Sequence, residues 1–238
     1  MKESIERVQL NRLDHAVDRT YKQLQLKRSK TKIQIMASHN IFAAEEILLN
    51  AKKLKAGLII IGTHGATGMK FLGSTTTHLI NNSPKPVLAI PPKYCFKKIR
   101  TIVYASDLEN TLDELKQLTV IAKTVKAKVE ALHLLTGENE QESKAKLITA
   151  IKRAGYKNIK AVIEIEKPDL TILEHLNAYL RRTKPQMFVM FPQERSLFDK
   201  LFVRGKTEEL AYTTKLPMLT IKKNSRIERN PDLRPGLF

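Results

Sequence analysis

Residues 57–92 read GLIIIGTHGATGMKFLGSTTTHLINNSPKPVLAIPP, and this stretch decides the fold class. It begins with a continuous apolar run at 57–61, which predicts a strand covered on both faces of a sheet. A glycine-rich segment at 62–73 leads into a short helix predicted at 75–81, and the apolar run 86–90 predicts a further strand. A strand, a loop, a helix and a second strand in this order are typical of α/β proteins.

The same alternation continues on both sides of this stretch. Upstream, residues 32–37 (KIQIMA) predict a strand and residues 43–54 a helix with one apolar face. Downstream, we expect strands at 101–105, 128–134, 159–165, 187–190 and 218–221, separated by helices at 112–125, 142–153, 171–180 and 207–212. Such alternation predicts a parallel sheet with helices on both faces.

The sequence also contains an internal repeat. The segments KAGLIIIGTHG (55–65) and SPKPVLAIPP (83–92) resemble KPQMFVMFPQE (184–194) and TTKLPMLTIKK (213–223), in that order. Leu58 to Pro86 is 28 positions, whereas the matching interval from Met187 to Pro217 is 30, so the first copy is shorter by two residues. The first copy has three predicted strands and the second has five. We therefore expect a partial domain at 1–94, a complete domain at 95–222 and a loosely ordered tail at 223–238.

The charge balance bears on possible partners. The chain has 238 residues, 42 Lys and Arg against 24 Asp and Glu, and a formal net charge of +18. The excess is spread along the sequence: 15 basic and 6 acidic residues fall in 1–94, 23 and 16 in 95–222, and 4 and 2 in 223–238. Because most basic residues are lysines interleaved with glutamates, we favour a solvated surface and do not expect nucleic-acid binding.

Other features limit the location and the chemistry. No apolar run approaches the roughly 20 residues of a membrane helix, so no membrane association is expected. Cys95 is the only cysteine, which fits a reducing cytoplasm. The six histidines lack metal-ligand spacing, so no metal site is expected. No nucleophile elbow and no paired acid and base stand out, so no catalytic residues are predicted.

The glycine-rich segment carries the most chemistry. Glycines let backbone N–H groups approach an anion, and the N-terminus of the following helix adds a partial positive charge. Ser74 and Thr75 are placed to cap that helix or to bind phosphate oxygens. A phosphate-binding loop and a tight turn with a helix cap both stay open, because the segment is neither a Walker motif nor a dinucleotide fingerprint.

At these residues the chain resembles the universal stress protein family. LIIIGTHGATG, GST and SPKPVLAIP resemble the end of one such domain, KKIRTIVYASDLEN resembles the start of a second, and residues 186–221 resemble the degenerate closing half of tandem members. The resemblance implies an α/β fold with two doubly wound parallel sheets of strand order 3-2-1-4-5, the first lacking its first two strands. In that order the strand at 32–37 has no neighbour, so we expect either further sequence upstream or a different pairing.

The resemblance also implies a nucleotide site. Family members that bind ATP carry Gly-x2-Gly-x9-Gly-Ser/Thr and an aspartate after the first strand. By type and place, the matching residues are Gly62, Gly65, Gly73 and Ser74, with Ile61, His64 and Thr75 beside them and Asp107 in the second copy.

Both copies depart from the family motif. Only seven residues separate Gly65 from Gly73, and the first copy lacks the aspartate. The second copy has Asp107 but carries Glu194 where Gly65 aligns. Asp107 also has an alternative interpretation as the cap of the helix that follows its strand. Neither copy therefore has a complete motif.

These observations lead to one expectation and two alternatives. We expect a cytoplasmic stress-response or regulatory binding protein with degenerate nucleotide-binding motifs and no enzyme activity beyond slow ATP hydrolysis. The alternatives are an ATP-binding switch with slow hydrolysis and a basic protein associated with nucleic acid. ATP is the one cofactor that the resemblance implies. The final strands, 86–90 and 217–221, are expected to pair as an internal pseudo-dimer, and the same contact would serve a homodimer.

Overall fold

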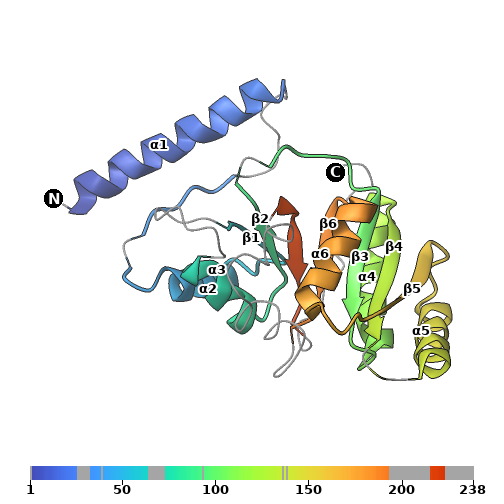
Figure 1. The fold of residues 1–238 in the computed structure, drawn as a ribbon. Helices are drawn as coiled ribbons and strands as arrows, with labels where there is room; N and C mark the ends of the chain where they lie inside the picture. Colours follow the sequence, from blue (N-terminus) through green and yellow to red (C-terminus); the bar gives the residue numbers. More distant parts are fainter. Residues whose placement is uncertain are drawn as a thin grey trace. The chain divides into compact units, whose positions relative to one another are not determined.

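A computed structural model describes residues 2–25, 33–38, 40–63, 73–92, 94–135, 137, 139–192 and 215–222. The chain separates into two compact units, Met1–Ile47 and Leu48–Phe238. Figure 1 shows the secondary structure elements in chain order. The predicted helix at 207–212 and the tail from residue 223 lie outside the described residues.

The first unit holds a long helix that the sequence analysis did not predict. Helix α1 spans Lys2–Gln23. Residues 33–38 follow with no regular secondary structure, so the strand predicted at 32–37 is wrong over its described part. Ile33 is 39% exposed and Met36 45%. Alternating apolar residues favour a strand only where a neighbouring strand takes up the backbone hydrogen bonds, and the described residues supply none here.

Helix α2, Ala43–Lys53, begins at a local side-chain turn. The Asn40 Oδ1 atom accepts the N–H of Phe42 at 2.9 Å, and the Asn40 amide donates to Glu46 Oε2 at 3.0 Å. Glu45 and Glu46 lie in the first turn and Lys52 and Lys53 in the last, which complements the helix dipole. The predicted helix at 43–54 is confirmed.

The second unit is built on one seven-stranded sheet of described residues, in the order β1-β2-β7-β6-β3-β4-β5. The strands are β1 Ile59–Gly62, β2 Val87–Ile90, β3 Thr101–Ser106, β4 Lys128–Leu135, β5 Ile159–Ile165, β6 Met187–Met190 and β7 Met218–Thr220. The helices are α3 Ser74–Asn82, α4 Thr111–Val125, α5 Glu140–Ala154 and α6 Ile172–Thr183. Strands β5, β4, β3, β6 and β7 stand in the predicted order 3-2-1-4-5, and all their pairings are parallel.

Strand registers match between the two copies of the internal repeat. Ile59 pairs with Val87 in the first copy, and Phe188, which aligns with Ile59, pairs with Met218 in the second. The first backbone hydrogen bond of each strand pair also matches. The Ile59 N–H donates to the Pro86 carbonyl at 2.9 Å, and the Phe188 N–H donates to the Pro217 carbonyl at 3.0 Å. The sequence repeat is therefore also a repeat of strand geometry.

The two final strands lie side by side, as predicted. Val87 pairs with Thr220, Leu88 with Leu219 and Ala89 with Met218, in antiparallel register. This one antiparallel pair joins the two parallel sets into a single sheet where two sheets were expected. It also makes β1 and β2 run opposite to the other five strands.

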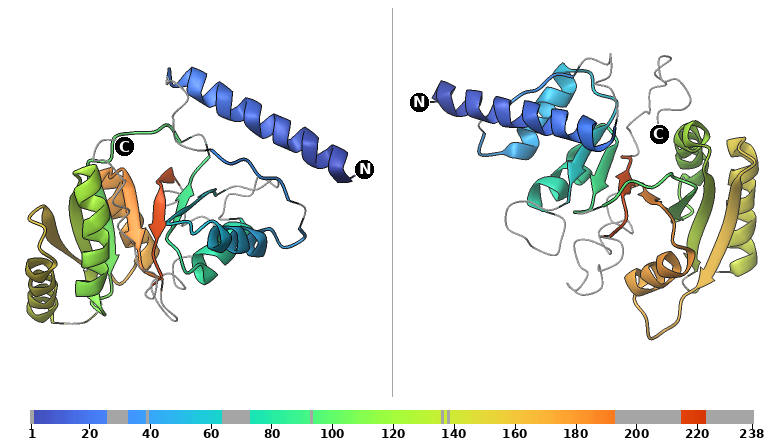
Figure 2. Two further views of the ribbon diagram at one scale, coloured as in Figure 1. Left: turned by 180° about the vertical axis from the view of Figure 1, so that it is seen from behind. Right: turned by 90° about the horizontal axis from the view of Figure 1, so that it is seen from above.

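Helices cover both faces of the five-stranded set. The right-hand view in Figure 2 shows α4 (green) and α5 (yellow) on one face of this set and α6 (orange) on the other. The core under α4 and α5 contains fully buried residues of several elements, among them Ile102 and Tyr104 of β3, Leu118 of α4 and Val129 of β4. Apolar residues of the predicted strands are at most 3% exposed at six positions (Ile102, Val103, Leu132, Val189, Met190 and Leu219), while Leu134 and Val162 are half-buried.

Strand β1 is different, because it is the edge of the described sheet. Ile59 is buried, but Ile60 is 64% exposed and Leu58 is 40% exposed. The expectation that 57–61 is covered on both faces is therefore wrong. The aligned strand in the second copy, β6, has all four residues buried because β3 lies on its outer side.

Candidate functional site

The carboxyl ends of β3 and β6 form the natural ligand position in the second copy. The strand order reverses between them, since β3 leads on to β4 on one side and β6 leads on to β7 on the other. In open α/β sheets, ligands bind outside the carboxyl ends of strands at such a point. Asp107 directly follows β3, so the predicted site residue of the second copy lies here.

The loop after β3 is tightly folded on its own side chains. Asp107 Oδ1 accepts the N–H of Glu109 at 2.9 Å, and Ser106 Oγ accepts the N–H of Leu108 at 3.2 Å. Ser106 Oγ also lies 2.9 Å from Thr111 Oγ1, and both side chains are buried. Leu108 and Asn110 adopt left-handed backbone angles, with φ of 65° and 51°. Ser106 and Thr111 were not predicted as site residues, although serine and threonine flanking an aspartate are typical of such turns.

Asp107 is not the cap of helix α4. The residue at the N-cap is Asn110, whose side chain makes no capping bond, while its carbonyl accepts the N–H groups of Asp113 and Glu114 at 3.0 and 3.2 Å. The alternative interpretation of Asp107 as a helix cap is therefore wrong. Its carboxylate closes the turn that precedes the helix.

The surroundings of Asp107 raise the pKa of its carboxyl group. Burial raises the pKa of Asp107, and the charge of Glu109 raises it further, while the Glu109 N–H bond and His133 act in the opposite direction. His133 is buried on β4, with Nδ1 2.9 Å from the carbonyl oxygen of Ser106. Because a carbonyl only accepts, Nδ1 carries the proton, and the ring ties the end of β3 to β4.

The position that aligns with Gly62 in the second copy holds an aromatic ring. Phe191 is 5% exposed, and its ring meets Tyr104 edge to face at 5.8 Å between centroids. Tyr104 is fully buried, and its hydroxyl donates to Glu114 of α4. Burial and the neighbouring Glu114 charge raise the pKa of Tyr104. In the second copy, a buried aromatic side chain therefore occupies the position where the family motif has a glycine.

In the first copy, the ends of β1 and α3 are brought together. The Gly73 N–H donates to the Thr63 carbonyl at 2.9 Å, and Thr76 Oγ1 donates to the Gly62 carbonyl at 3.2 Å. Gly73 is the N-cap of α3 and has no side chain to cap the first turn, in which Ser74 and Thr75 stand. Ile61 and Gly62 therefore lie near Gly73, Ser74 and Thr75, as the motif predicts.

Gly62 stands in open space. A Cβ atom added there would meet nothing within 4 Å, and its φ is not left-handed. Gly62 is thus not required by packing in the described structure, which leaves room for a ligand or simply for solvent. His64 and Gly65 lie outside the described residues.

The six predicted site residues that the structure describes do not form one site. Asp107 follows β3, whereas Ile61, Gly62, Gly73, Ser74 and Thr75 surround the end of β1, and three strands lie between β1 and β3. At about 4.8 Å per strand this separation is about 19 Å. Strands β1 and β3 also run in opposite directions. The carboxyl end of β1 therefore lies at the side of the sheet where β3 begins, and not at the side where β3 ends.

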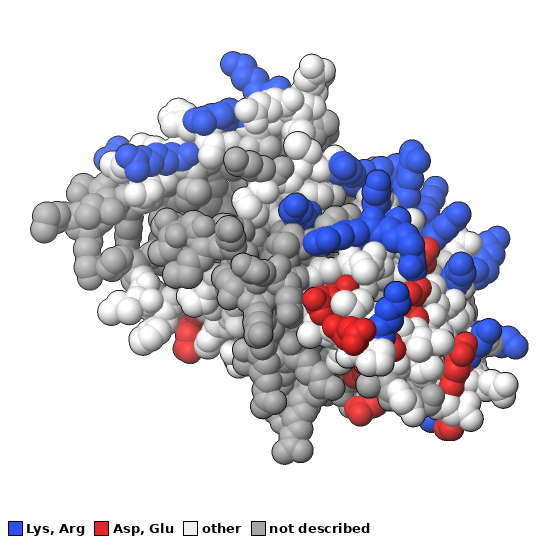
Figure 3. All heavy atoms as spheres, in the orientation of Figure 1, with Lys and Arg blue, Asp and Glu red and all other residues white. Residues whose placement is uncertain are grey.

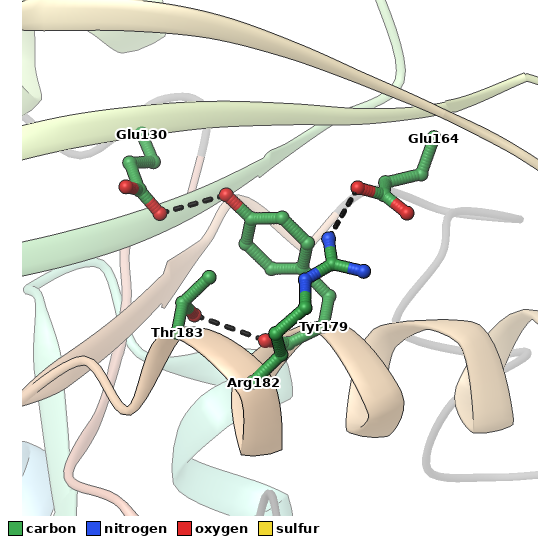
Figure 4. Close-up of polar contacts among 5 residues, drawn as sticks. All are labelled: Glu130, Glu164, Tyr179, Arg182 and Thr183. Atoms are coloured by element: carbon green, nitrogen blue, oxygen red, sulfur yellow. Dashed lines mark hydrogen bonds and ion pairs between the residues drawn. The ribbon is translucent and has the colours of Figure 1, made fainter.

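A second polar cluster fastens helix α6 to the sheet, as Figure 4 shows. Tyr179 donates to Glu130 of β4 at 2.7 Å, and Arg182 pairs with Glu164 of β5 at 2.5 Å. The Arg182 guanidinium lies over the Tyr179 ring, 5.2 Å from its centroid. Each carboxylate has a donor from α6, so the cluster is a docking contact of that helix. Within the described ranges, no group of three or more His, Cys, Asp or Glu side chains could hold a metal.

A substitution at Gly62 tests whether this glycine is needed for the stability of the fold. We expect Gly62→Ala to change the free energy of unfolding by less than about 1 kcal/mol, because the Cβ meets no atom and the backbone is compatible. Gly155→Ala is the control, since Gly155 ends α5 with φ of 69° and should cost more than about 1 kcal/mol. Urea unfolding followed by circular dichroism measures both. Equal losses would contradict the open surroundings of Gly62.

Known proteins resemble this chain both in sequence and in structure. Residues 2–91 match the sequence model of the universal stress protein family. A putative universal stress protein from Pseudomonas aeruginosa has a similar structure, with a TM-score of 0.58 and 17% identity, over 89% of this chain and 78% of that one. One from Archaeoglobus fulgidus gives 0.54 and 16%, over 75% of this chain and 64% of that one, which is less than two thirds of its length. A search of curated proteins found no match.

These comparisons establish the fold. The chain shares the α/β architecture of universal stress proteins, and its first 91 residues resemble that family in sequence as well. In the described part of the chain, no helix is long and apolar enough to span a membrane.

Proposed function

We propose that this chain is a regulatory binding protein of the universal stress type, in which both nucleotide-binding motifs have degenerated. The proposed division is a partial domain at 1–94, a complete domain at 95–222 and a tail at 223–238. The repeat of strand register between β1–β2 and β6–β7 supports two related halves. The protein is proposed to act in the cytoplasm by binding, without catalysing a reaction.

One observation carries this proposal. The glycine half of the motif lies at the end of β1, and the aspartate half lies at the end of β3, on opposite edges of the sheet. Beside β1 no described strand occupies the place that β3 occupies beside β6. Beside β3, the buried Phe191 ring occupies the glycine position. The first copy therefore keeps the glycines of the motif without the aspartate, and the second copy keeps the aspartate without the glycines.

The test is ATP binding by the full chain. We expect 1 mM ATP with Mg²⁺ to leave the unfolding midpoint in urea unchanged, since neither half offers both a phosphate loop and an aspartate. A ligand present at 100 times its dissociation constant would add about 2.7 kcal/mol. Titration calorimetry gives the affinity directly, and a micromolar dissociation constant would favour the alternative of an ATP-binding switch.

The pairing of β2 with β7 also bears on self-association. Strand β2 lies between β1 and β7, and β7 lies between β2 and β6, so both final strands have neighbours on both sides. A homodimer through these strands would have to break the internal pair. We therefore propose that the contact is used within one chain.

A further inference from the structure

The N-terminal end of the five parallel strands carries an unbroken collection of positive charge. Four segments meet there: residues 94–101, 121–129, 150–160 and 181–187 lead into β3, β4, β5 and β6. Together they hold thirteen Lys and Arg residues and no Asp or Glu. Arg182 is engaged by Glu164. The other twelve are all exposed and are called the basic rim: Lys97, Lys98, Arg100, Lys123, Lys126, Lys128, Lys152, Arg153, Lys157, Lys160, Arg181 and Lys184.

Figure 3 shows this gathering of charge. Lys and Arg crowd the upper right of the view, above the N-terminal ends of β3 and β4, while Asp and Glu lie below them. The sequence shows the same distribution of charge, because residues 106–115, at the opposite end of β3, contain four acidic residues and no basic one. The second unit is therefore polarised along its strands.

Helix dipoles explain only part of the rim. Cations near a helix C-terminus are favourable, and Lys123, Lys152, Arg153 and Arg181 lie in the last turns of α4, α5 and α6. Lys126 and Lys184 stand at C-caps. The remaining six lie outside helices and their caps: Lys97, Lys98, Arg100, Lys128, Lys157 and Lys160. A separate cause is needed for these.

The lysines of the rim are not neutralised by the carboxylates of the described residues. Among those residues, ion pairs join Lys116 to Asp113, Lys146 to Glu142 and Arg182 to Glu164, and none includes a rim lysine. The nearest acidic residue along β4 is Glu130, which accepts the Tyr179 hydroxyl. Like charges held together on a folded surface repel one another, so a polyanion that binds there relieves that repulsion.

The geometry of the rim suits a linear array of phosphates. Arg100 precedes β3, Lys128 begins β4 and Lys160 stands near the start of β5, on adjacent strands about 4.8 Å apart. With Lys184 before β6, the row crosses four strands, about 14 Å. The carboxyl ends of β1 and β2 lie at this same edge, because they run the opposite way.

We propose that the basic rim binds the sugar–phosphate backbone of a nucleic-acid duplex, without sequence specificity. A duplex offers a dense and regular array of phosphates, with one negative charge per about 1.7 Å of axis. Single-strand binders stack successive bases on several aromatic rings, whereas Phe96 is the only exposed aromatic side chain in the four segments. Phe96 is also their only exposed large apolar side chain, which is too little for insertion into a membrane.

The experiment compares two quadruple variants of the full chain with equal net charge. The rim variant carries Lys97→Gln, Lys98→Gln, Lys128→Gln and Lys160→Gln. The control variant carries Lys22→Gln, Lys52→Gln, Lys53→Gln and Lys144→Gln, at exposed positions of α1, α2 and α5. Fluorescence anisotropy measures binding of a labelled 20-base-pair DNA duplex from 50 to 200 mM NaCl, and circular dichroism checks that both variants fold.

The native chain should bind with a steep salt dependence, in which each phosphate contact adds about 0.9 to the slope of log K against log salt. The rim variant should bind at least about tenfold more weakly at 100 mM salt and lose about 3 from that slope, whereas the control variant stays within about twofold of the native chain. Absence of duplex binding at 50 mM salt would overturn the proposal. Equal losses in both variants would reduce it to an effect of net charge and also overturn it.

Two further measurements keep the test decisive. Vesicles containing 30% phosphatidylserine are offered in parallel, and binding to these without binding to duplex would assign the rim to a membrane surface and refute the proposal. If the rim variant fails to fold, lysine acetylation of the native chain replaces it. Duplex should then protect Lys97, Lys98, Lys128 and Lys160 but not Lys22 or Lys144, and uniform protection would count against the rim. None of these outcomes depends on ATP binding.

Discussion

Val189→Asp should remove more than about 4 kcal/mol from the free energy of unfolding, whereas Ile60→Asp should remove about 1 kcal/mol or less. The two residues occupy aligned positions of the internal repeat, in β6 and β1. Val189 is fully buried between β3 and β7, so an aspartate there would be an unpaired buried charge. Ile60 is 64% exposed on the edge strand, where a carboxylate stays hydrated.

Urea unfolding followed by far-ultraviolet circular dichroism gives both values. If Val189→Asp is unfolded without denaturant, Val189→Ala supplies a graded measurement, with an expected loss of about 2 kcal/mol from two missing methyl groups. Ile60→Ala is its matched control and should cost about 0.5 kcal/mol or less. A large loss at Ile60 would mean that the outer side of β1 is covered in solution, contrary to the described edge.

This pair of residues also shows where sequence reasoning succeeded and where it stopped. The apolar runs GLIII (57–61) and MFVM (187–190) predict two strands, and strands form at both places, as β1 and β6. Burial, however, depends on the neighbouring strand: β3 lies beside β6, and no described strand lies beside β1. The strand predicted at 32–37 failed for a related reason, since alternating apolar residues cannot form a strand without a hydrogen-bonding partner.

The candidate site was predictable in its residues but not in its arrangement. Gly62, Gly73 and Ser74 come together because β1 and α3 are close to each other in the sequence, which spacing can indicate. The distance to Asp107 depends on the antiparallel pairing of β2 with β7. The sequence suggested that these strands pair. The consequence, that the ends of β1 and β3 then point to opposite edges, follows only once the strand directions are known.

The basic rim could not be found by counting charge along the chain. Each of its four segments has three or four basic residues, and the stretches that separate them in sequence, 102–120, 130–149 and 161–180, each contain four acidic residues. Parallel strands place every strand start at the same edge of the sheet, so four modest segments become one surface. The even distribution of charge along the sequence is therefore compatible with strong clustering in space.

Two buried tyrosines should make the protein sensitive to alkali. Burial is the main cause that raises the pKa of both Tyr104 and Tyr179, and the carboxylates of Glu114 and Glu130 raise it further. The folded protein therefore keeps two phenolic protons that the unfolded chain releases near pH 10. Stability from this source is complete below pH 10 and is lost as the pH rises above it, by about 1.4 kcal/mol per pH unit for each group.

Unfolding in urea at pH 9, 10 and 11 measures the effect, with Tyr104→Phe, Tyr179→Phe and the double variant for comparison. Lysine titration affects all four proteins alike, so the difference in slope isolates the phenols. Because each phenol of the unfolded chain is already half ionised at pH 10, the native chain should lose about 2 kcal/mol more than the double variant between pH 10 and 11. At pH 8, Tyr104→Phe alone should cost about 1–3 kcal/mol, because Glu114 loses a buried donor.

The two single variants distinguish local from global loss. Tyr179 fastens α6 to β4, whereas Tyr104 fastens α4 to β3, so their contributions should add if both helices leave the sheet in one cooperative transition. A separate early transition at alkaline pH in the native chain, absent from Tyr179→Phe, would instead mean that α6 detaches first. Equal alkaline slopes in the native chain and the double variant would show that these phenols ionise as freely in the folded protein as in the unfolded chain, and that the hydrogen bonds to Glu114 and Glu130 do not hold in solution.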